Sequence, residues 1–275
     1  MQNAGIAKLG LNWRYLACEV HPDDLRGAIA GAKAMRFVGL NLTVPHKLLA
    51  LDMVDELDES AKVWKAVNTI RFEGKDSAGS WKPLGEFESS PGEIRAHGFN
   101  TDADAITRSL KEDLGLGLPG KTVLLLGAGG AGRTAALKLA EQGVAALFLV
   151  NRTASKAEEL AAEIQERHPA VKVKVGYPGR KVDLLLNATS LGLKTDDSLP
   201  FDEGDFSLKD AAAVYDMIYR PADTPLLKVA RAAGCRTANG LGMLLFQGAK
   251  ALELWSGKAA PVAAMKTALE KNVYG

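Results

Sequence analysis

The stretch "TVLLLGAGGAGRTAALKLAEQG", residues 122–143, is the most informative in this chain of 275 residues. Its unbroken apolar run predicts a buried strand, its glycine cluster a tight turn, and the alanines and leucines that follow a helix closed by Gly143. A buried strand that leads through glycines into a helix is typical of a parallel α/β sheet. This stretch therefore predicts where a second domain begins, with a boundary at the "LPGK" turn before it.

The glycine spacing within this stretch predicts a dinucleotide site. "GAGGAG", residues 127–132, matches G-x-G-x-x-G between a strand and a helix, the context that the motif requires. Gly127 permits the tight turn, Gly129 lets the backbone approach a pyrophosphate at the helix N-terminus, and Gly132 lets helix and strand pack closely. The alternative is a glycine-rich turn without a ligand.

The end of the next strand indicates which dinucleotide binds. An NAD site usually carries an acidic residue there, to bind the ribose hydroxyls. This chain has "NRTASK", residues 151–156, without an acid. Arg152 can stack on adenine and pair with a 2′-phosphate, and Lys156 can add a second charge. We therefore expect NADP rather than NAD, although Arg152 could also be a solvated loop residue.

Apolar periodicity predicts the remaining elements. Residues 11–20 are rich in strand formers, and the pattern that follows predicts a β-α-β-α-β run with a largely parallel sheet. Residues 73–97 are rich in Gly, Ser, Pro and charge, which predicts a hairpin-like excursion or an exposed loop rather than a core element. Ser155 and Glu158 match a capping box at the start of a helix. The expected helices are 21–35, 45–66 in one or two pieces, 102–115, 155–168, 223–234, 241–256 and 261–272. The expected strands are 36–44, 67–72, 122–127, 145–153, 171–175, 182–187, 212–217 and 235–239.

Composition excludes several classes of protein. The net charge is +1 and no basic block occurs, which argues against a nucleic-acid partner. No apolar run approaches the roughly 20 residues that span a bilayer, and no signal peptide is recognisable. The two cysteines, Cys18 and Cys235, form neither a disulfide framework nor a zinc site, and we expect no metal. These features predict a cytoplasmic protein.

The stretch "NLTVPHK", residues 41–47, contains a candidate for chemistry. A helix that begins at Pro45 places Lys47 in its first turn, at the positive end of the helix dipole, where a cation is disfavoured. Thr43 would lie at the carboxyl end of a strand, where ligands of α/β proteins bind. A lysine near a loop is most often merely solvated, so the rest of the chain has to decide.

Two further polar clusters follow strands, "AVNT" at 66–69 and "GFNTD" at 98–102. Each has a plain explanation, because Asn68 could close a turn and Asp102 could cap the helix that follows. Together with Lys47 they place a lysine, an aspartate and several amide or hydroxyl groups at strand ends that face one crevice.

The ordered motifs "NLTVPHK", "AVNT", "GFNTD", "GAGGAG", "NRTASK", "NATS", "YDMIY" and "NGLGMLLFQGA" resemble the shikimate dehydrogenase family across nearly the whole chain. The resemblance implies an α/β substrate domain at 1–101, a Rossmann-type NADP-binding domain at 102–239, and C-terminal helices at 240–275 that return to the first domain. It also implies the reduction of 3-dehydroshikimate to shikimate with NADPH. A quinate/shikimate enzyme of relaxed specificity and a catalytically weak NADP-binding paralogue remain alternatives, as does either a monomer or a homodimer.

The resemblance carries functional roles to individual residues. Lys47 would move the proton at the reacting oxygen, and Asp102 would orient Lys47 and bind a substrate hydroxyl. The residues that resemble substrate contacts are Thr43, Asn68, Tyr219 and Gln247. The residues that resemble cofactor contacts are Gly127, Ala128, Gly129, Gly130, Ala131, Asn151, Arg152, Thr153, Ala154, Ser155, Lys156, Thr189, Ser190, Met217 and Gly240.

The chain departs from the family pattern at its start. The family opens with a strand and a Ser-x-Ser-Pro loop whose serines hold the substrate carboxylate, whereas this chain opens with "MQNAG", with Gln2 in place of a histidine. Each lost charge-assisted hydrogen bond would cost about 1.5–3 kcal/mol. We therefore expect weak or absent turnover with cofactor binding preserved. Lys65 also stands where the family usually has glycine.

Overall fold

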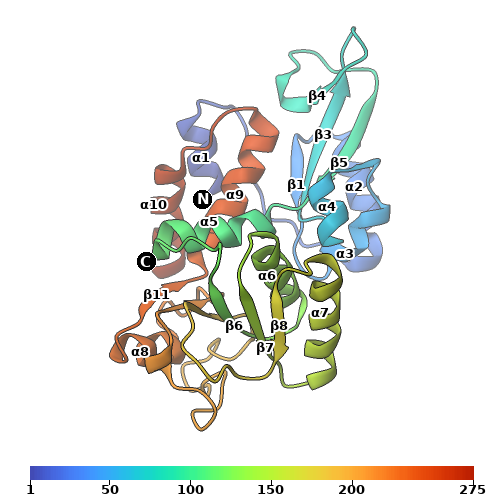
Figure 1. The fold of residues 1–275 in the computed structure, drawn as a ribbon. Coiled ribbons are helices and arrows are strands. Elements are labelled where there is room, and N and C mark those ends of the chain that lie inside the picture. Colours follow the sequence, from blue (N-terminus) through green and yellow to red (C-terminus); the bar gives the residue numbers. More distant parts are fainter. The chain divides into compact units, whose positions relative to one another are not determined.

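The computed structural model describes all residues from 1 to 275. They form two compact units (Figure 1). Unit 1 contains residues 1–102 and 245–275, and unit 2 contains residues 103–244. Each unit is described by itself.

Unit 1 is built from short helices around a mixed sheet. Its helices are α1 (Gln2–Lys8), α2 (Leu25–Ala34), α3 (His46–Leu49), α4 (Glu59–Trp64), most of α9 (Leu241–Ser256) and α10 (Val262–Tyr274), with 3-10 turns at Pro22–Asp24, Ala50–Asp52 and Leu84–Glu86. Its strands are β1 (Gly39–Asn41), β2 (Glu56–Leu57), β3 (Thr69–Lys75), β4 (Trp81–Pro83) and β5 (Ile94–Phe99).

The sheet of unit 1 is not largely parallel, so that prediction was wrong. The strand order is β1-β3-β5-β2 with β4 beside β3. Central β3 runs antiparallel to β1, β4 and β5, and only β2 and β5 pair in parallel. The cause is the 76–93 excursion, which returns the chain as a hairpin and so forces β3 and β5 into antiparallel pairing.

Residues 11–20 form no strand, so the strand expected there from their strand-forming residues is wrong. Strand formers make a strand only where a neighbouring backbone offers a ladder, and β1 pairs with β3 alone. Side chains hold the segment instead. Asn3 accepts from the Tyr15 N–H at 2.8 Å and donates to the Tyr15 carbonyl at 2.9 Å.

The predicted hairpin-like excursion is confirmed, but the expectation that residues 73–97 contribute no core element was wrong, because Leu84 and Ala96 are buried in the core. Figure 1 shows β3 and β5 extending together with β4 at the far end. Glu73 in β3 is only 1% exposed and accepts hydrogen bonds from Arg71, Arg95 and His97. Burial raises the pKa of Glu73, but these hydrogen bonds outweigh it and lower the pKa to about 2.

Alternation along β3 and β5 separates this charged face of the sheet from the apolar one. Ile70 and Phe72 in β3 and Ala96 in β5 face the core, against α2 and α4. The buried core residues are Leu25, Ile29, Ala32, Ala50, Ala61, Val67, Ile70, Phe72, Leu84 and Ala96.

Unit 2 alternates strands and helices. Its helices are α5 (Asp102–Leu114), α6 (Gly130–Glu141), α7 (Ala154–Arg167) and α8 (Pro225–Ala232), with a 3-10 turn at Leu208–Asp210. Its strands are β6 (Thr122–Leu126), β7 (Ala146–Val150), β8 (Lys172–Val175), β9 (Leu184–Asn187), β10 (Ala213–Asp216) and β11 (Arg236–Asn239). The predicted elements of this part are confirmed to within a few residues.

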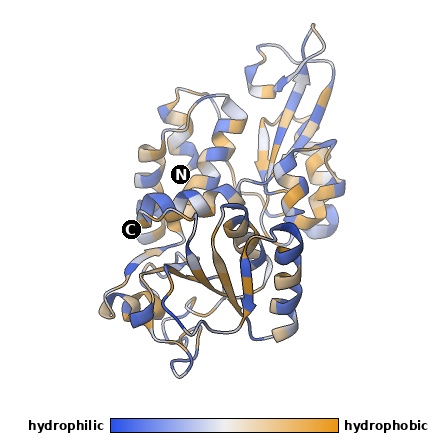
Figure 2. Cartoon of the chain, viewed as in Figure 1, coloured by the Kyte–Doolittle hydropathy of each residue, from blue (hydrophilic) through white to orange (hydrophobic).

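The sheet of unit 2 is wholly parallel, with strand order β11-β10-β9-β6-β7-β8. Counted from β6, this is the doubly wound 3-2-1-4-5-6 order of a Rossmann fold, in which ligands bind where the order reverses, here between β6 and β9. Figure 2 shows the central strands as hydrophobic, whereas edge strand β8 is banded with its lysines, which disfavour edge-to-edge pairing. The chain is an α/β protein, as expected.

Candidate functional site

The turn after β6 is shaped by two glycines. Gly127 has a φ of 102°, in the left-handed region, and a Cβ there would lie 3.0 Å from the carbonyl carbon of Ala188 after β9. A Cβ at Gly132 would lie 2.0 Å from the Gly127 carbonyl oxygen. By contrast, Gly129 and Gly130 face open space. The turn therefore lies at the reversal point of the sheet and leaves its backbone open to a ligand.

Asn151 joins this turn to the end of β7. Its Oδ1 accepts a hydrogen bond from the Ala128 N–H at 2.9 Å, and its Nδ2 donates to the Thr153 carbonyl at 2.8 Å. The side chain fixes the separation between the glycine turn and the "NRT" loop. A pyrophosphate on the turn and a ribose beside the loop need these two segments at a fixed distance.

Two cations beside this loop suit a phosphate. Arg152 and Lys156 are exposed and form no ion pair, whereas Arg133 on α6 is occupied by Glu163, with Nε 2.8 Å from Oε2. The predicted capping box of Ser155 and Glu158 is wrong. Helix α7 begins at Ala154, so the residue before it is Thr153 and not Ser155. The open backbone at Gly129 and Gly130 and the unpaired side chains of Arg152 and Lys156 fit an NADP molecule, and the contact of the two cations with its 2′-phosphate stays a prediction.

The loop after β9 is held by buried polar side chains. Thr189 donates to Asn187 Oδ1 from both its backbone N–H (3.0 Å) and its hydroxyl (2.8 Å). Asn187 in turn donates to Asp216 at 3.0 Å, and Asp216 accepts from the Thr224 hydroxyl at 2.7 Å. Burial raises the pKa of Asp216 despite these hydrogen bonds. The network makes the Thr189 loop a fixed edge of the reversal point.

The other predicted residues of unit 2 lie on neighbouring loops. A Cβ at Gly240, before α9, would lie 2.0 Å from the Met217 carbonyl oxygen, so the segments after β10 and β11 are in contact. Ser190 and Tyr219 are exposed, on the loops after β9 and β10. Tyr219 thus belongs to unit 2, while the other predicted substrate contacts belong to unit 1.

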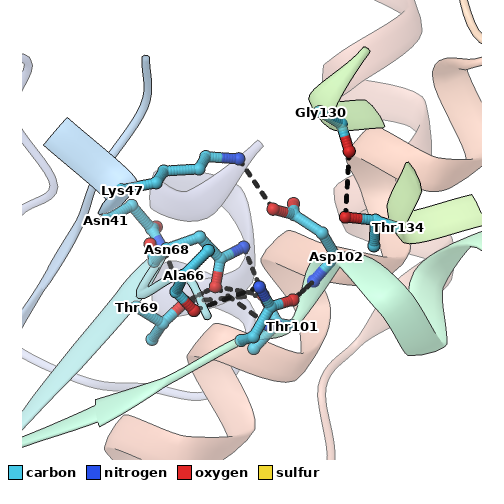
Figure 3. A network of polar contacts seen from close by, with 10 residues as sticks. Asn41, Lys47, Ala66, Asn68, Thr69, Thr101, Asp102, Gly130 and Thr134 are labelled. Atoms are coloured by element: carbon cyan, nitrogen blue, oxygen red, sulfur yellow. Dashed lines mark hydrogen bonds and ion pairs between the residues drawn. The ribbon is translucent and has the colours of Figure 1, made fainter. Parts of the chain in front are cut away.

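Within unit 1 the two predicted catalytic residues are in direct contact (Figure 3). Lys47 Nζ donates to Asp102 Oδ2 at 2.7 Å, and their side chains are 27% and 15% exposed. Lys47 lies in α3, which begins directly after Pro45, and Asp102 is the first residue of α5. Residues 55 positions apart therefore form a partly desolvated lysine–carboxylate pair, a pair that can hold and move a proton at one reacting oxygen.

A buried polar network lies directly behind this pair. Asn68, 1% exposed, accepts from the Thr101 N–H at 2.8 Å and donates to the Thr101 hydroxyl at 3.0 Å. Thr69 donates to Asn68 Oδ1 at 3.1 Å, and Asn41 donates to the Thr69 hydroxyl at 3.0 Å. Figure 3 shows these side chains gathered at the strand ends beneath Lys47 and Asp102. Asn68 is thus held firmly, and its contact with substrate stays a prediction.

Sequence reasoning missed Asn100. Its Oδ1 accepts a hydrogen bond from the Asp102 N–H at 3.0 Å, so Asn100, not Asp102, caps α5 and leaves the Asp102 carboxylate to Lys47. Its Nδ2 donates to the Ala66 carbonyl at 3.1 Å. Asparagine close to the start of a helix is itself a capping signal, which could have identified it.

The remaining residues of interest are in unit 1. Thr43 is exposed and Gln247 lies partly buried in α9. His46 Nε2 lies 2.9 Å from the Val20 carbonyl oxygen, which indicates a packing role. Lys65 ends α4 with a φ of 49°, in the left-handed region that favours glycine, which explains the glycine of the family pattern.

Comparisons with known proteins identify the family. Three family models match: the shikimate dehydrogenase substrate binding domain at residues 1–70, shikimate / quinate 5-dehydrogenase at 109–190, and the shikimate 5'-dehydrogenase C-terminal domain at 240–270. The NADP(+)-type shikimate dehydrogenase of Methanopyrus kandleri is 39% identical over 99% of this chain and 90% of that protein. That of Moorella thermoacetica is 40% identical over 98% and 87%.

Solved structures agree with these relatives. A shikimate dehydrogenase in complex with NADP+ superposes with a TM-score of 0.81 at 34% identity, covering 99% of this chain and 90% of that one. A ligand-free 5-ketofructose reductase of Gluconobacter gives 0.81 at 36% identity, covering 98% and 92%. None of the helices described here is both long and apolar enough to cross a membrane. The full-length identity and the matching fold lead to one conclusion: the chain belongs to the family of NADP-dependent shikimate dehydrogenases.

Proposed function

We propose that this chain interconverts 3-dehydroshikimate and shikimate with NADP as the cofactor. The observation that supports this best is the Lys47–Asp102 pair at 2.7 Å, backed by strand-end amides and hydroxyls. The relatives reported above favour an enzyme over a non-catalytic binding protein. They are named NADP(+)-type shikimate dehydrogenases, and this chain aligns with most of their length.

In this proposal Lys47 handles the proton. NADPH, when bound, would supply the hydride that reduces the carbonyl carbon of the substrate. The Lys47 ammonium donates its proton to the carbonyl oxygen, which becomes the new hydroxyl, and neutral Lys47 then regains a proton from solvent. In the reverse direction neutral Lys47 removes the hydroxyl proton. Proton transfer by a positioned side chain contributes about 100- to 10,000-fold to a rate.

Asp102 has two tasks in the same proposal. One carboxylate oxygen holds Lys47 Nζ at 2.7 Å and so orients it toward the reacting oxygen. The other can accept a hydrogen bond from a neighbouring substrate hydroxyl. The contacts of Thr43, Asn68, Gln247 and Tyr219 with substrate remain proposals from family resemblance, as do the roles of units 1 and 2 as substrate and NADP domains.

The cofactor would be held by the glycine turn and the "NRT" loop. The open backbone at Gly129 and Gly130 suits the pyrophosphate. Arg152 and Lys156 suit the 2′-phosphate, because neither forms an ion pair of its own. Thr189, Met217 and Gly240 are proposed for the nicotinamide end.

A direct assay tests the proposal. Purified chain, shikimate and NADP⁺ should produce reduced cofactor, followed by its absorbance. Lys47→Ala should lower kcat by about 100- to 10,000-fold, whereas Lys62→Ala, which removes an exposed lysine on α4, should leave kcat unchanged. Quinate, 5-ketofructose and NAD⁺ serve as comparison substrates and cofactor.

Two results would overturn the proposal. One is equal activity of Lys47→Ala and the unaltered chain. The other is NADP⁺ binding without turnover of any of these substrates, which would favour the weak paralogue. A higher kcat/KM for quinate than for shikimate would instead move the assignment to the quinate enzyme.

We also propose a cytoplasmic location and a monomer or homodimer. Cys18 and Cys235 are free thiols, which suits a reducing compartment. A fluorescent fusion would test the location, and light scattering of the purified chain would test the oligomeric state.

A further inference from the structure

We propose that Asn100 is a positioning residue for the reaction, because its side chain ties the backbone that carries Asp102 to the backbone that carries Lys47. The inference rests on the proposed function, in which Lys47 and Asp102 act as a pair. Asn100 itself is not proposed to contact the substrate or the cofactor.

The first step is the double hydrogen bond of the Asn100 side chain. Its Oδ1 accepts from the Asp102 N–H at 3.0 Å, and its Nδ2 donates to the Ala66 carbonyl at 3.1 Å. One planar amide therefore joins the start of α5 to the loop that follows α4. Asn100 is 6% exposed, so water does not compete freely for either bond.

The second step leads from that loop to Lys47. Ala66 is followed by Val67, whose N–H donates to the Lys47 carbonyl at 2.8 Å. These bonds form a closed path. It runs from the Asp102 backbone through the Asn100 amide to the Ala66–Val67 backbone, and from there to the Lys47 backbone. The 2.7 Å contact between Lys47 Nζ and Asp102 Oδ2 completes it. Figure 3 shows Ala66, Lys47 and Asp102 around this path.

The third step concerns what holds Asn100 itself. Its backbone N–H donates to Ser60 Oγ at 3.0 Å, and that hydroxyl donates to Asp58 Oδ1 at 2.6 Å. Burial raises the pKa of Asp58, but hydrogen bonds from Ser60 outweigh it and lower the pKa. Asn100 is thus fixed from behind by a charged, capped helix start.

The geometry explains why losing the Asn100 hydrogen bonds should lower the reaction rate. A displacement of about 1 Å at a reacting group costs about 100-fold in rate. The Asn100 amide sets the separation of the two backbones. Without it, the flexible side chain of Lys47 would be free to move its Nζ away from Asp102. A serine at position 100 can still cap α5, but it is too short to reach the Ala66 carbonyl.

The test uses the full chain with Asn100→Ser and Asn100→Ala. Asn3→Ser is the matched control, because Asn3 in the same unit also bridges two backbone groups, the N–H and carbonyl of Tyr15. We expect both Asn100 variants to lower kcat by about 10- to 100-fold, with KM for shikimate and NADP⁺ changed by less than about twofold. Asn3→Ser should leave kcat unchanged.

A second readout does not depend on turnover. Reductive methylation with formaldehyde, quantified by peptide mass spectrometry, reports how freely Lys47 Nζ leaves Asp102. We expect Lys47 to react several-fold faster in both Asn100 variants, while the exposed Lys62 reacts at an unchanged rate. This readout still decides the role of Asn100 if the unaltered chain turns over none of the substrates, which would defeat only the proposed function.

Three results would overturn the positioning role. The first is that Asn100→Ser keeps the kcat of the unaltered chain. The second is that the rate of Lys47 methylation stays unchanged in both variants. The third is that methylation rises equally at Lys47 and Lys62, since that would show general loosening of unit 1.

Discussion

At the scale of single residues, we propose that Arg152 decides the choice between NADP and NAD. It follows β7 and stays exposed without an ion pair, and the acid of an NAD site is missing beside it. Arg133 on α6 is already occupied by Glu163. We therefore expect the Arg152 guanidinium to distinguish a 2′-phosphate from a 2′-hydroxyl.

The change Arg152→Ala should raise KM for NADP⁺ by about 10- to 100-fold and leave KM for NAD⁺ nearly unchanged. The reason is the loss of charge-assisted hydrogen bonds of about 1.5–3 kcal/mol, which only the phosphate makes. Steady-state kinetics with both cofactors measures this. Lys174→Ala, an exposed cation on β8, is the control. A parallel rise for both cofactors would contradict the prediction.

Capping residues show the limit of sequence reasoning at this scale. Both Asn100 and Asp102 are good caps, and the sequence pointed to Asp102; Ser155 was likewise chosen where α7 begins after Thr153. Neighbouring Asn, Asp, Ser and Thr have nearly the same capping preference, so tertiary partners decide between them. For Asp102 the deciding partner is Lys47, which is distant in sequence.

At the scale of elements, the β3–β5 hairpin depends on Glu73. Its carboxylate is almost fully buried beneath Arg71, Arg95 and His97, and its pKa falls from the usual 4.5 to about 2. A carboxylate with a depressed pKa in the folded state stabilises the fold above its unfolded pKa. That stability is lost as pH falls from about 4.5 to about 2, and the shift corresponds to about 3 kcal/mol.

We expect Glu73→Gln to lower the free energy of unfolding by about 3–5 kcal/mol at neutral pH, because Arg71 and Arg95 lose their buried counter-charge. Urea unfolding measures the difference. It should shrink as pH falls from about 4.5 to about 2, where the unaltered chain loses the same charge.

Glu93→Gln, at an exposed ion pair with Lys75, is the control and should change stability by less than about 1 kcal/mol. A difference for Glu73→Gln that stays constant over the whole pH range would contradict the role given to its charge.

The elements of unit 2 were predictable because each signal was local. A buried parallel strand reads as an apolar run, and the helices between such strands have apolar periodicity and glycine ends. Unit 1 was harder. Strand direction there depends on how a hairpin returns the chain, and residues 11–20 needed a neighbouring backbone that β1 does not provide. Composition carries no information on either point.

At the scale of the whole molecule, unit 1 is assembled from both ends of the chain. Trp255 in α9 donates from Nε1 to the Ile70 carbonyl in β3 at 2.9 Å, across 185 positions. Gln2 in α1 donates to the Gly248 carbonyl at 2.9 Å, and Gly5 packs against Leu252. The last 31 residues, 245–275, are therefore part of the first unit's core.

We expect Trp255→Phe to lower the free energy of unfolding by about 1–3 kcal/mol, because the buried Ile70 carbonyl loses a donor while an aromatic ring remains. Urea unfolding measures this, and Trp81→Phe on the hairpin, where the indole is partly exposed, is the control. Equal effects of the two changes would contradict the special role of the Trp255 donor.

The discontinuity of unit 1 fixes an order of events on the ribosome. Unit 2 is one uninterrupted segment and can fold as soon as it has emerged, since domains generally fold as units during synthesis. Residues 1–102 emerge before α9 and α10, which complete their unit. Until those two helices have emerged, the surface around Ile6 and β3 stays uncovered, so this part of the nascent chain is open to chaperones while unit 2 is synthesised.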